Sequence, residues 1–450
     1  MDDHSCAGTD AARCQALAAS DPDFGAWAEG YGAMRHLPAT QLRVHEMAGA
    51  LRTQGISGDG FPFYDLMRAL DRLASAGMWL VVHAAYASRV FLDGRPLQAG
   101  NFKASPQGHL GGSLNMVPAY AGLLGLDVLT GITRAWIMGQ GHCVSAIDSL
   151  NTLVGNLSAA HAARYDVSTQ GLSRFAQDFY AMRLDRHGRV ESPLGSHVNV
   201  HTAGSTIEGG FLGFAELLYP HMPLPGERLV AFLSDGAFEE QRGSDWAPRW
   251  WRSEDSGLVA PIMIANGRRI DTRTLTEQEG GPRWLMEHLR LNGFEPVLLD
   301  GRDPAAFVWA IWHMESRLQQ QAEAIRAGRQ KYPVRLPYGV AVAPKGAGFF
   351  GEGTNAAHNL PLPGNPAQDD ESARLFNHWA GLLRVPEPEL REALVHFADP
   401  PGRVRERDVP SAHREVRLRH QPEPQWLTVE GPARSPARWK LRSAMQAIDE

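Results

Sequence analysis

Two short apolar runs, each ending in small polar residues, constrain the fold of this chain more than any other feature. The first covers residues 229–233 and is followed by Ser234-Asp235-Gly236; the second covers residues 261–265 and is followed by Asn266-Gly267. Runs this short and this apolar are typical of strands buried on both faces of a sheet. Residues 234–260 between them leave room for the crossover that parallel strands require. The pattern predicts two neighbouring strands of a parallel sheet.

The residues that follow these runs predict a binding site. Ligands of open parallel sheets bind beyond the carboxyl ends of the strands, which is where Asp235 and Asn266 would lie side by side. Gly236 and Gly267 would let the backbone come close to a ligand. One anionic and one neutral oxygen donor suit Mg2+, which takes few protein oxygens and keeps positions for phosphate and water. The alternative is that both groups are ordinary turn residues after strands.

The rest of the chain repeats the order strand, loop, helix. This recurrence predicts an α/β fold, a doubly wound, mostly parallel sheet with helices on both faces. Residues 1–30 are expected to form a loosely docked polar tail, and residues 31–370 the main domain. Residues 371–450 are expected to hold helices and then a proline- and arginine-rich linker or partner-binding segment. Further strands are predicted at 134–138, 296–299 and 334–342, and helices at 63–78, 116–129, 282–291 and 303–327.

Composition excludes several classes of protein. The net charge of −6, with acidic and basic residues mixed, argues against general binding of nucleic acid. Three cysteines, Cys6, Cys14 and Cys143, form neither a disulfide framework nor a metal-ligand pattern. No apolar run approaches the roughly 20 residues of a membrane span. The first residues are acidic rather than basic and then apolar, so a cytoplasmic protein is expected.

Four histidines lie in loops that contain glycine or serine: His109, His142, His197 and His358. Taken singly, each is better explained as a structural residue. One sheet edge could nevertheless collect all four, and converging histidines suit an enzyme that moves protons near neutral pH. Zinc is the competing interpretation, but no two of the four are three to five residues apart.

These loops resemble those of a known family. Gly108-His109-Leu110-Gly111-Gly112-Ser113 resembles the glycine-histidine loop of transketolases. Asp235 and Asn266 are similar in spacing to the thiamine-diphosphate motif, Gly-Asp-Gly followed by Asn. The order of the remaining loops across residues 100–365 resembles phosphoketolases: Gly141-His142, Ser196-His197-Val198, Thr202-Ala203-Gly204-Ser205 with Glu208-Gly209-Gly210, Pro344-Lys345-Gly346 and His358-Asn359-Leu360-Pro361.

The resemblance implies the domain that holds the diphosphate of thiamine diphosphate with Mg2+. It also implies C–C bond cleavage in a ketose phosphate, with inorganic phosphate releasing acetyl phosphate; the cofactor supplies the difficult chemistry. The metal ligands would be Asp235, Asn266 and the main-chain carbonyl of Arg268. The four histidines would surround the substrate and assist proton transfer. The residues expected against cofactor or sugar are Gly141, Ser196, Ser234, Asp235, Gly236, Glu239, Asn266 and Lys345.

Two departures from the family shape the expectation. Ser234 stands where the family has a glycine, and no second domain is recognised that would hold the aminopyrimidine ring and supply an activating glutamate. We therefore expect the diphosphate-binding subunit of a split enzyme, working in a hetero-oligomer with a separate pyrimidine-binding subunit. The alternatives are transketolase-type two-carbon transfer or sugar-phosphate 3-epimerisation on the same fold, and a degenerate, non-catalytic binding or regulatory subunit.

Overall fold

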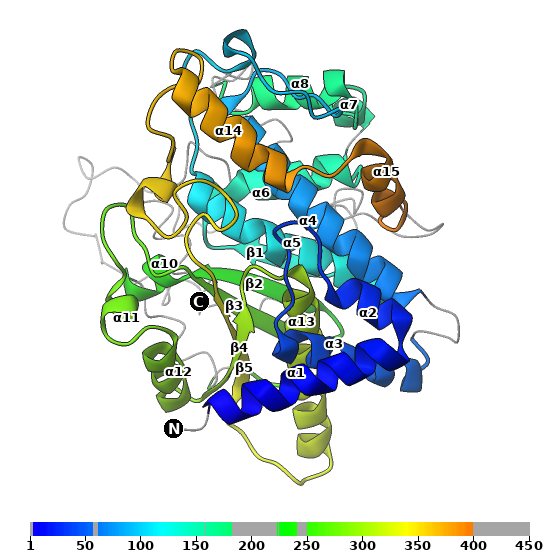
Figure 1. Ribbon diagram of the computed structural model, residues 1–450. Coiled ribbons are helices and arrows are strands. Elements are labelled where there is room, and N and C mark those ends of the chain that lie inside the picture. Colours follow the sequence, from blue (N-terminus) through cyan, green and yellow to red (C-terminus); the bar gives the residue numbers. More distant parts are fainter. Residues whose placement is uncertain are drawn as a thin grey trace, which may run out of the picture. The chain divides into compact units, whose positions relative to one another are not determined.

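A computed structural model describes residues 3–56, 62–157, 159–181, 223, 225–240, 249 and 251–398, all within a compact unit, Met1–Asp408. Its centre is a parallel sheet in which the described strands follow the order β1-β2-β3-β5-β4 (Figure 1). The prediction of a parallel sheet is confirmed, and the two runs described first are neighbours in it. The strands are β1 Ala135–Met138, β2 Arg228–Ser234, β3 Leu258–Ala265, β4 Phe294–Asp300 and β5 Leu336–Val342.

Helices cover both faces of the sheet because successive strand residues point to opposite sides. In β2, Val230 and Phe232 belong to a core shared with α4 (Phe63–Tyr86), α5 (Leu110–Thr130) and α13 (Pro304–Arg326). Leu229, Ala231 and Leu233 belong to a second core, shared with α12 (Pro282–Leu291). The expected doubly wound arrangement is therefore confirmed.

The N-terminal residues are not the loosely docked tail that composition suggested. They form α1 Asp3–Ser20, α2 Pro22–Ala28 and α3 Pro38–Thr53. Phe24 and Trp27 are fully buried, and the Phe24 ring lies edge-on to His45 and Tyr64 at centroid distances of 5.5 and 5.6 Å. Two large aromatic side chains thus fix a stretch whose other residues are mostly small or polar.

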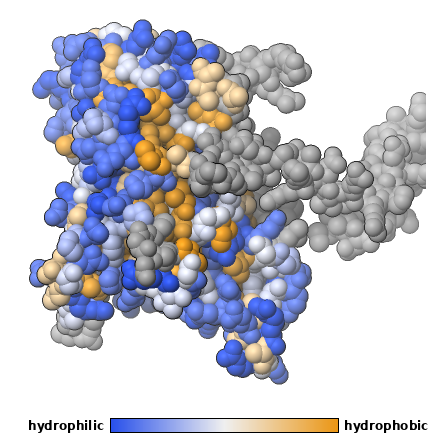
Figure 2. Space-filling model, turned by 90° about the vertical axis from the view of Figure 1, so that its right-hand side faces the viewer, coloured by the Kyte–Doolittle hydropathy of each residue, from blue (hydrophilic) through white to orange (hydrophobic). Residues whose placement is uncertain are grey.

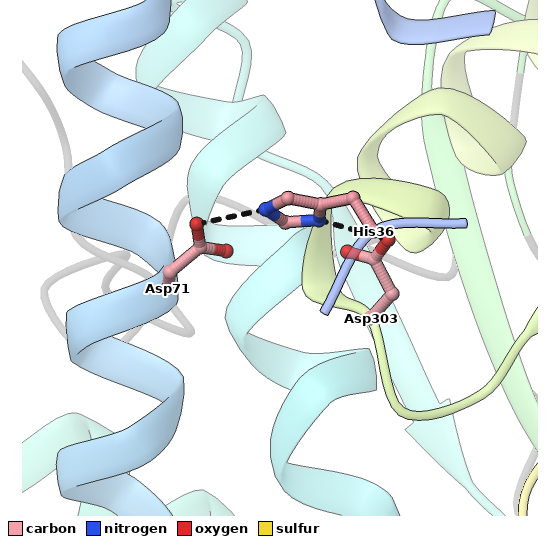
Figure 3. A group of neighbouring side chains, drawn as sticks. All are labelled: His36, Asp71 and Asp303. Carbon is pink, nitrogen blue, oxygen red and sulfur yellow. Dashed lines mark hydrogen bonds and ion pairs between the residues drawn. The ribbon is translucent and has the colours of Figure 1, made fainter. Parts of the chain in front are cut away.

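A buried histidine connects these helices to the rest of the domain. Between α2 and α3, the Nε2 atom of His36 lies 3.0 Å from Oδ2 of Asp71 on α4, and Nδ1 lies 3.0 Å from Oδ2 of Asp303, the N-cap of α13 (Figure 3). Burial disfavours the charged ring, but the carboxylates of Asp303 and Asp71 outweigh it and raise the pKa of His36 to about 10. Each nitrogen faces its own carboxylate, so the group is an imidazolium bridging two anions.

The helices after residue 370 also belong to the domain. Both α14 (Asp370–Leu383) and α15 (Glu387–Val395) pack against α4, and their residues Phe376, Leu383 and Leu390 are buried. The change of composition near residue 370 is therefore not the end of the folded unit. Shorter described elements are η1 Ala99–Asn101, η2 Gly141–Cys143, α6 Val144–Leu153, α7 Ala159–Ala162, α8 Thr169–Asp178, α10 Asp235–Glu240, α11 Leu275–Gln278 and η5 Asn355–His358. Among the described helices, none combines the length and the apolar character needed to cross a membrane.

Candidate active site

Asp235 lies directly after β2, at the carboxyl edge of the sheet, and is buried at 2% exposure. Its Oδ1 accepts the amide hydrogen of Gly236 at 2.9 Å, and its Oδ2 accepts that of Gly267, beyond β3, at 2.8 Å. Burial raises the pKa of Asp235 to about 6, although both amide donors work to lower it. A carboxylate held in this way is an anion that is costly to bury without a cation.

A cavity of about 250 Å3 opens beside this carboxylate. Asn266, Gly267 and Arg268 line it, as do residues from α11, α12 and the loop after β5. Asn266 Oδ1 accepts the amide hydrogen of Arg268 at 3.1 Å, which folds the turn after β3 against the cavity. The three residues predicted to hold the metal therefore share one cavity, and carboxylate, amide and carbonyl oxygens are the donors that Mg2+ takes.

Lys345 joins this turn to the histidines. Its ammonium group donates to the main-chain oxygens of Arg269 at 2.8 Å and Arg268 at 3.3 Å, and to Nδ1 of His358 at 2.8 Å. The residue is 3% exposed, and burial lowers the pKa of Lys345 to about 8. Because Nδ1 of His358 accepts this hydrogen bond, the neutral His358 ring carries its proton on Nε2.

Three of the four predicted histidines meet. The ring centroids of His109, His142 and His358 lie 5.3, 5.7 and 5.9 Å apart in pairs. Burial is the main cause that lowers the pKa of His142 to about 3, lowers that of His358 to about 4 and lowers that of His109; Lys345 adds to all three. The cluster is therefore neutral at pH 7. Nδ1 of His109 is buried and has no hydrogen-bond partner among the described residues.

Other predicted site residues take different positions. Gly141 is buried in η2 beside the histidines, and Ser234 and Gly236 flank Asp235. Glu239 is absent from the cavity lining; its carboxylate accepts from the amide of Thr276 and the guanidinium of Arg269, and so holds the loop after β3. The predictions for Ser196 and His197, and for the loop residues 202–210, lie outside the described residues.

Sequence reasoning missed two residues that support this site. Asn115, 1% exposed within α5, donates to the carbonyl oxygen of Pro344 at 2.9 Å and accepts from the amide of Gly346 at 3.3 Å. Asn115 thereby holds both neighbours of Lys345. The signal in the sequence is a polar residue within an otherwise apolar helix, which could have identified Asn115 as a candidate. Tyr180 accepts from the amide of His109 at 3.3 Å, and nothing in its sequence context indicates this contact.

Similarity to known proteins extends over most of the chain. The profile of the XFP N-terminal domain matches residues 64–389. A probable phosphoketolase from Rhodopseudomonas palustris (strain HaA2) is 27% identical over 350 residues, 74% of this chain and 43% of its own length. Probable phosphoketolase 2 of Lactiplantibacillus plantarum is 25% identical over 66% of this chain and 38% of its own. The chain thus spans less than half the length of these relatives.

Among solved structures, a transketolase from Pichia stipitis matches 73% of this chain and 44% of its own, at 16% identity and a TM-score of 0.41. The profile match covers well over half of the sequence and contains Asp235, Asn266, Lys345 and the three clustered histidines. The predicted resemblance to phosphoketolases is confirmed by this match and by the relatives above. The chain belongs to the XFP N-terminal domain family, a phosphoketolase-like family that depends on thiamine diphosphate.

Proposed function

We propose that this chain is the diphosphate-binding part of a phosphoketolase-like enzyme that cleaves a C–C bond of a ketose phosphate. One observation carries the proposal: a cavity beside Asp235, Asn266 and Arg268 is linked through Lys345 to a cluster of neutral histidines. Oxygen donors for a metal and groups that move protons thus lie in adjoining parts of one site.

Asp235, Asn266 and the carbonyl of Arg268 would hold Mg2+, and the metal would hold the diphosphate of the cofactor in the cavity. When bound, thiamine diphosphate supplies carbanion chemistry at a carbonyl carbon. His358, with its proton on Nε2, can donate to a substrate oxygen. His109, with Nδ1 unengaged, can exchange a proton with a hydroxyl group. Neutral histidines can act in both directions, which suits loss of water from a sugar.

The aminopyrimidine end of the cofactor would be bound by a separate subunit, making the working enzyme a hetero-oligomer. Figure 2 supports a partner surface, because apolar residues form a band on one face, with hydrophilic residues to the left of the band in this view. Contiguous apolar patches of this kind are typical of interfaces.

Calorimetry with thiamine diphosphate and Mg2+ tests the binding site. Asp235→Asn keeps the shape of the side chain but removes its charge, and should weaken cofactor affinity more than about 100-fold, because changes one shell further from a metal already cost 10–100-fold. Asp300→Asn is the matched control: Asp300 also ends a strand of this sheet, but pairs with Arg302. If the wild-type chain with its partner subunit binds no cofactor, the proposal is wrong.

Product analysis from xylulose 5-phosphate, with and without inorganic phosphate, tests the reaction. The phosphoketolase reaction gives acetyl phosphate only when inorganic phosphate is present. Sugar products without acetyl phosphate would instead indicate two-carbon transfer or epimerisation. Cofactor binding without any turnover would indicate a non-catalytic subunit.

A further inference from the structure

Tyr180 has an unusual backbone just beyond α8. Its φ of 58° is in the left-handed region, and it is the only non-glycine residue with positive φ in the described ranges. An aromatic residue adopts this conformation at an energetic cost and keeps it only where the surroundings enforce it. Such residues gather at functional sites, so the contacts of Tyr180 are informative.

A half-buried lysine holds the residue that precedes Tyr180. The ammonium of Lys103 donates to the carbonyl oxygen of Ala84, near the end of α4, at 2.6 Å, and to that of Phe179 at 2.7 Å. Its Nζ lies 5.9 Å from the centroid of the Tyr180 ring. Lys103 thus ties the residue before Tyr180 to α4, and the Tyr180 side chain extends to the loop of His109.

The side chain of Tyr180 contacts the first histidine loop. Its phenol oxygen accepts the amide hydrogen of His109 at 3.3 Å. A Cβ added to Gly108 would lie 3.6 Å from Cε2 of Tyr180, so the ring rests against the Gly108 backbone. On the far side, the amide of Leu110 donates to the carbonyl oxygen of Asn359 at 3.2 Å.

We propose that Tyr180 is a positioning residue, anchored by Lys103, that sets the His109 ring against His142 and His358. The role in turnover rests on the proposed function; the role in holding the loop does not. Tyr180 touches the His109 main chain and leaves the imidazole free, so it acts through the histidine rather than on the substrate. A phenol suits this task because its ring fills the space beside Gly108 while its oxygen accepts the amide hydrogen.

Amide hydrogen exchange at His109, measured by NMR, tests the contact directly. In Tyr180→Phe, which keeps the ring and removes the oxygen, exchange at His109 should accelerate at least about tenfold, because local opening governs exchange there. Tyr165→Phe is the control: the Tyr165 hydroxyl donates to Asp178 of α8 at 2.8 Å rather than to a histidine loop, and its loss should leave exchange at His109 unchanged. Unchanged exchange in Tyr180→Phe, or equal acceleration in both variants, would overturn the proposal.

Turnover in the enzyme assembled with its pyrimidine-binding partner separates positioning from simple stability. In Tyr180→Phe, kcat should fall roughly 10- to 100-fold while KM stays within about twofold, because small displacements of catalytic groups have effects of this size. Equal kcat values for Tyr180→Phe and wild type would remove the catalytic part of the proposal. If wild type shows no turnover but the exchange result holds, then the proposed function fails and the loop contact stands.

Discussion

Gly267 illustrates how one residue can shape the metal turn. Its φ of 72° is left-handed, its amide donates to Asp235, and a Cβ there would lie 3.2 Å from the Glu277 side chain. Gly328 has a similar φ of 68° with open space around it. Both Gly267→Ala and Gly328→Ala should therefore lose about 1 kcal/mol or more of unfolding free energy from backbone strain.

Only Gly267→Ala should also weaken binding of Mg2+ and thiamine diphosphate, because only at Gly267 would the added Cβ push the turn after β3 away from Glu277. Urea unfolding and calorimetry measure the two effects. Equal cofactor affinity in both variants would mean that the turn does not contact the cofactor.

Lys345 offers a second prediction at the residue scale. Burial is the main cause of the low pKa of His358, about 4, and the Lys345 charge is the next. Lys345→Met removes that charge and the proton donor to Nδ1, so the pKa of His358 should rise toward 6.5. NMR titration of the imidazole measures it, with the exposed Lys331→Met as control. A pKa that does not move would contradict the hydrogen bond between the two side chains.

The sequence predicts the place of a residue in the fold well where that place follows from local structure. Asp235 and Asn266 end neighbouring strands, and strand ends are visible as apolar runs. Glu239 lies on the next helix, but its direction is decided by Arg269 and Thr276, which only the folded chain brings near. Tyr180 could not be predicted, because an aromatic residue near the end of a helix looks like any core residue.

At the scale of elements, a helix can be predicted from sequence when its apolar residues recur with a clear helical period. The sequence predicts α12 with the bounds observed, because Pro282 occupies the first position and Leu285 and Leu289 form its buried stripe. In α1 and α2, small and polar residues dilute this periodicity. Instead, α2 is held by the tertiary contacts of Phe24 and Trp27, and α1 packs against α2 and α3. Packing, rather than propensity, stabilises them.

The junction of α3, α4 and α13 at His36 gives a prediction at this scale. His36→Ala would leave two buried carboxylates facing each other, and losing one partner of a buried ion pair costs about 3–5 kcal/mol. Urea unfolding measures the loss. His45→Ala on α3 is the control, since His45 makes one hydrogen bond, at 2.9 Å to the Tyr64 hydroxyl, and should cost less. Equal losses would argue against an ion pair at His36.

At the scale of the whole molecule, buried histidines of two kinds should set the pH range of stability. The pKa of His83 is lowered by burial to about 4, so its unfolded form takes up protons first and stability falls as pH drops from 6.5 to 4. The folded pKa of His36, about 10, is raised, so its contribution is complete below 6.5 and is lost as pH rises through 10.

Unfolding free energy should therefore be greatest near pH 6.5. For His83, a shift from 6.5 to about 4 corresponds to about 3 kcal/mol on the acid side. Denaturant unfolding across pH 4–10 measures the profile. His83→Phe should lessen the acid-side loss, to which His142 and His358 also contribute, and His36→Gln should flatten the alkaline side. A profile unchanged by both variants would contradict these assignments.

The order of strands in the whole sheet was beyond sequence reasoning. Apolar runs predict five strands, but β5 lies between β3 and β4, although it follows both in the chain. That placement depends on how α13 packs against α5 and the sheet. The class of fold follows from periodicity, whereas topology follows from the contacts that form between distant elements.

The ammonium of Lys345 already occupies the carbonyl oxygens of Arg268 and Arg269, so the protein carries its own cation at the turn where the metal is expected. A metal ion at the Arg268 carbonyl would join this ammonium, which keeps its hydrogen bonds to Arg269 and His358, at a turn that is already held in place. The conformational entropy of ordering this turn is then lost during folding rather than during binding. Such preorganisation lowers the stability of the fold, but it should increase the rate and the affinity of cofactor binding.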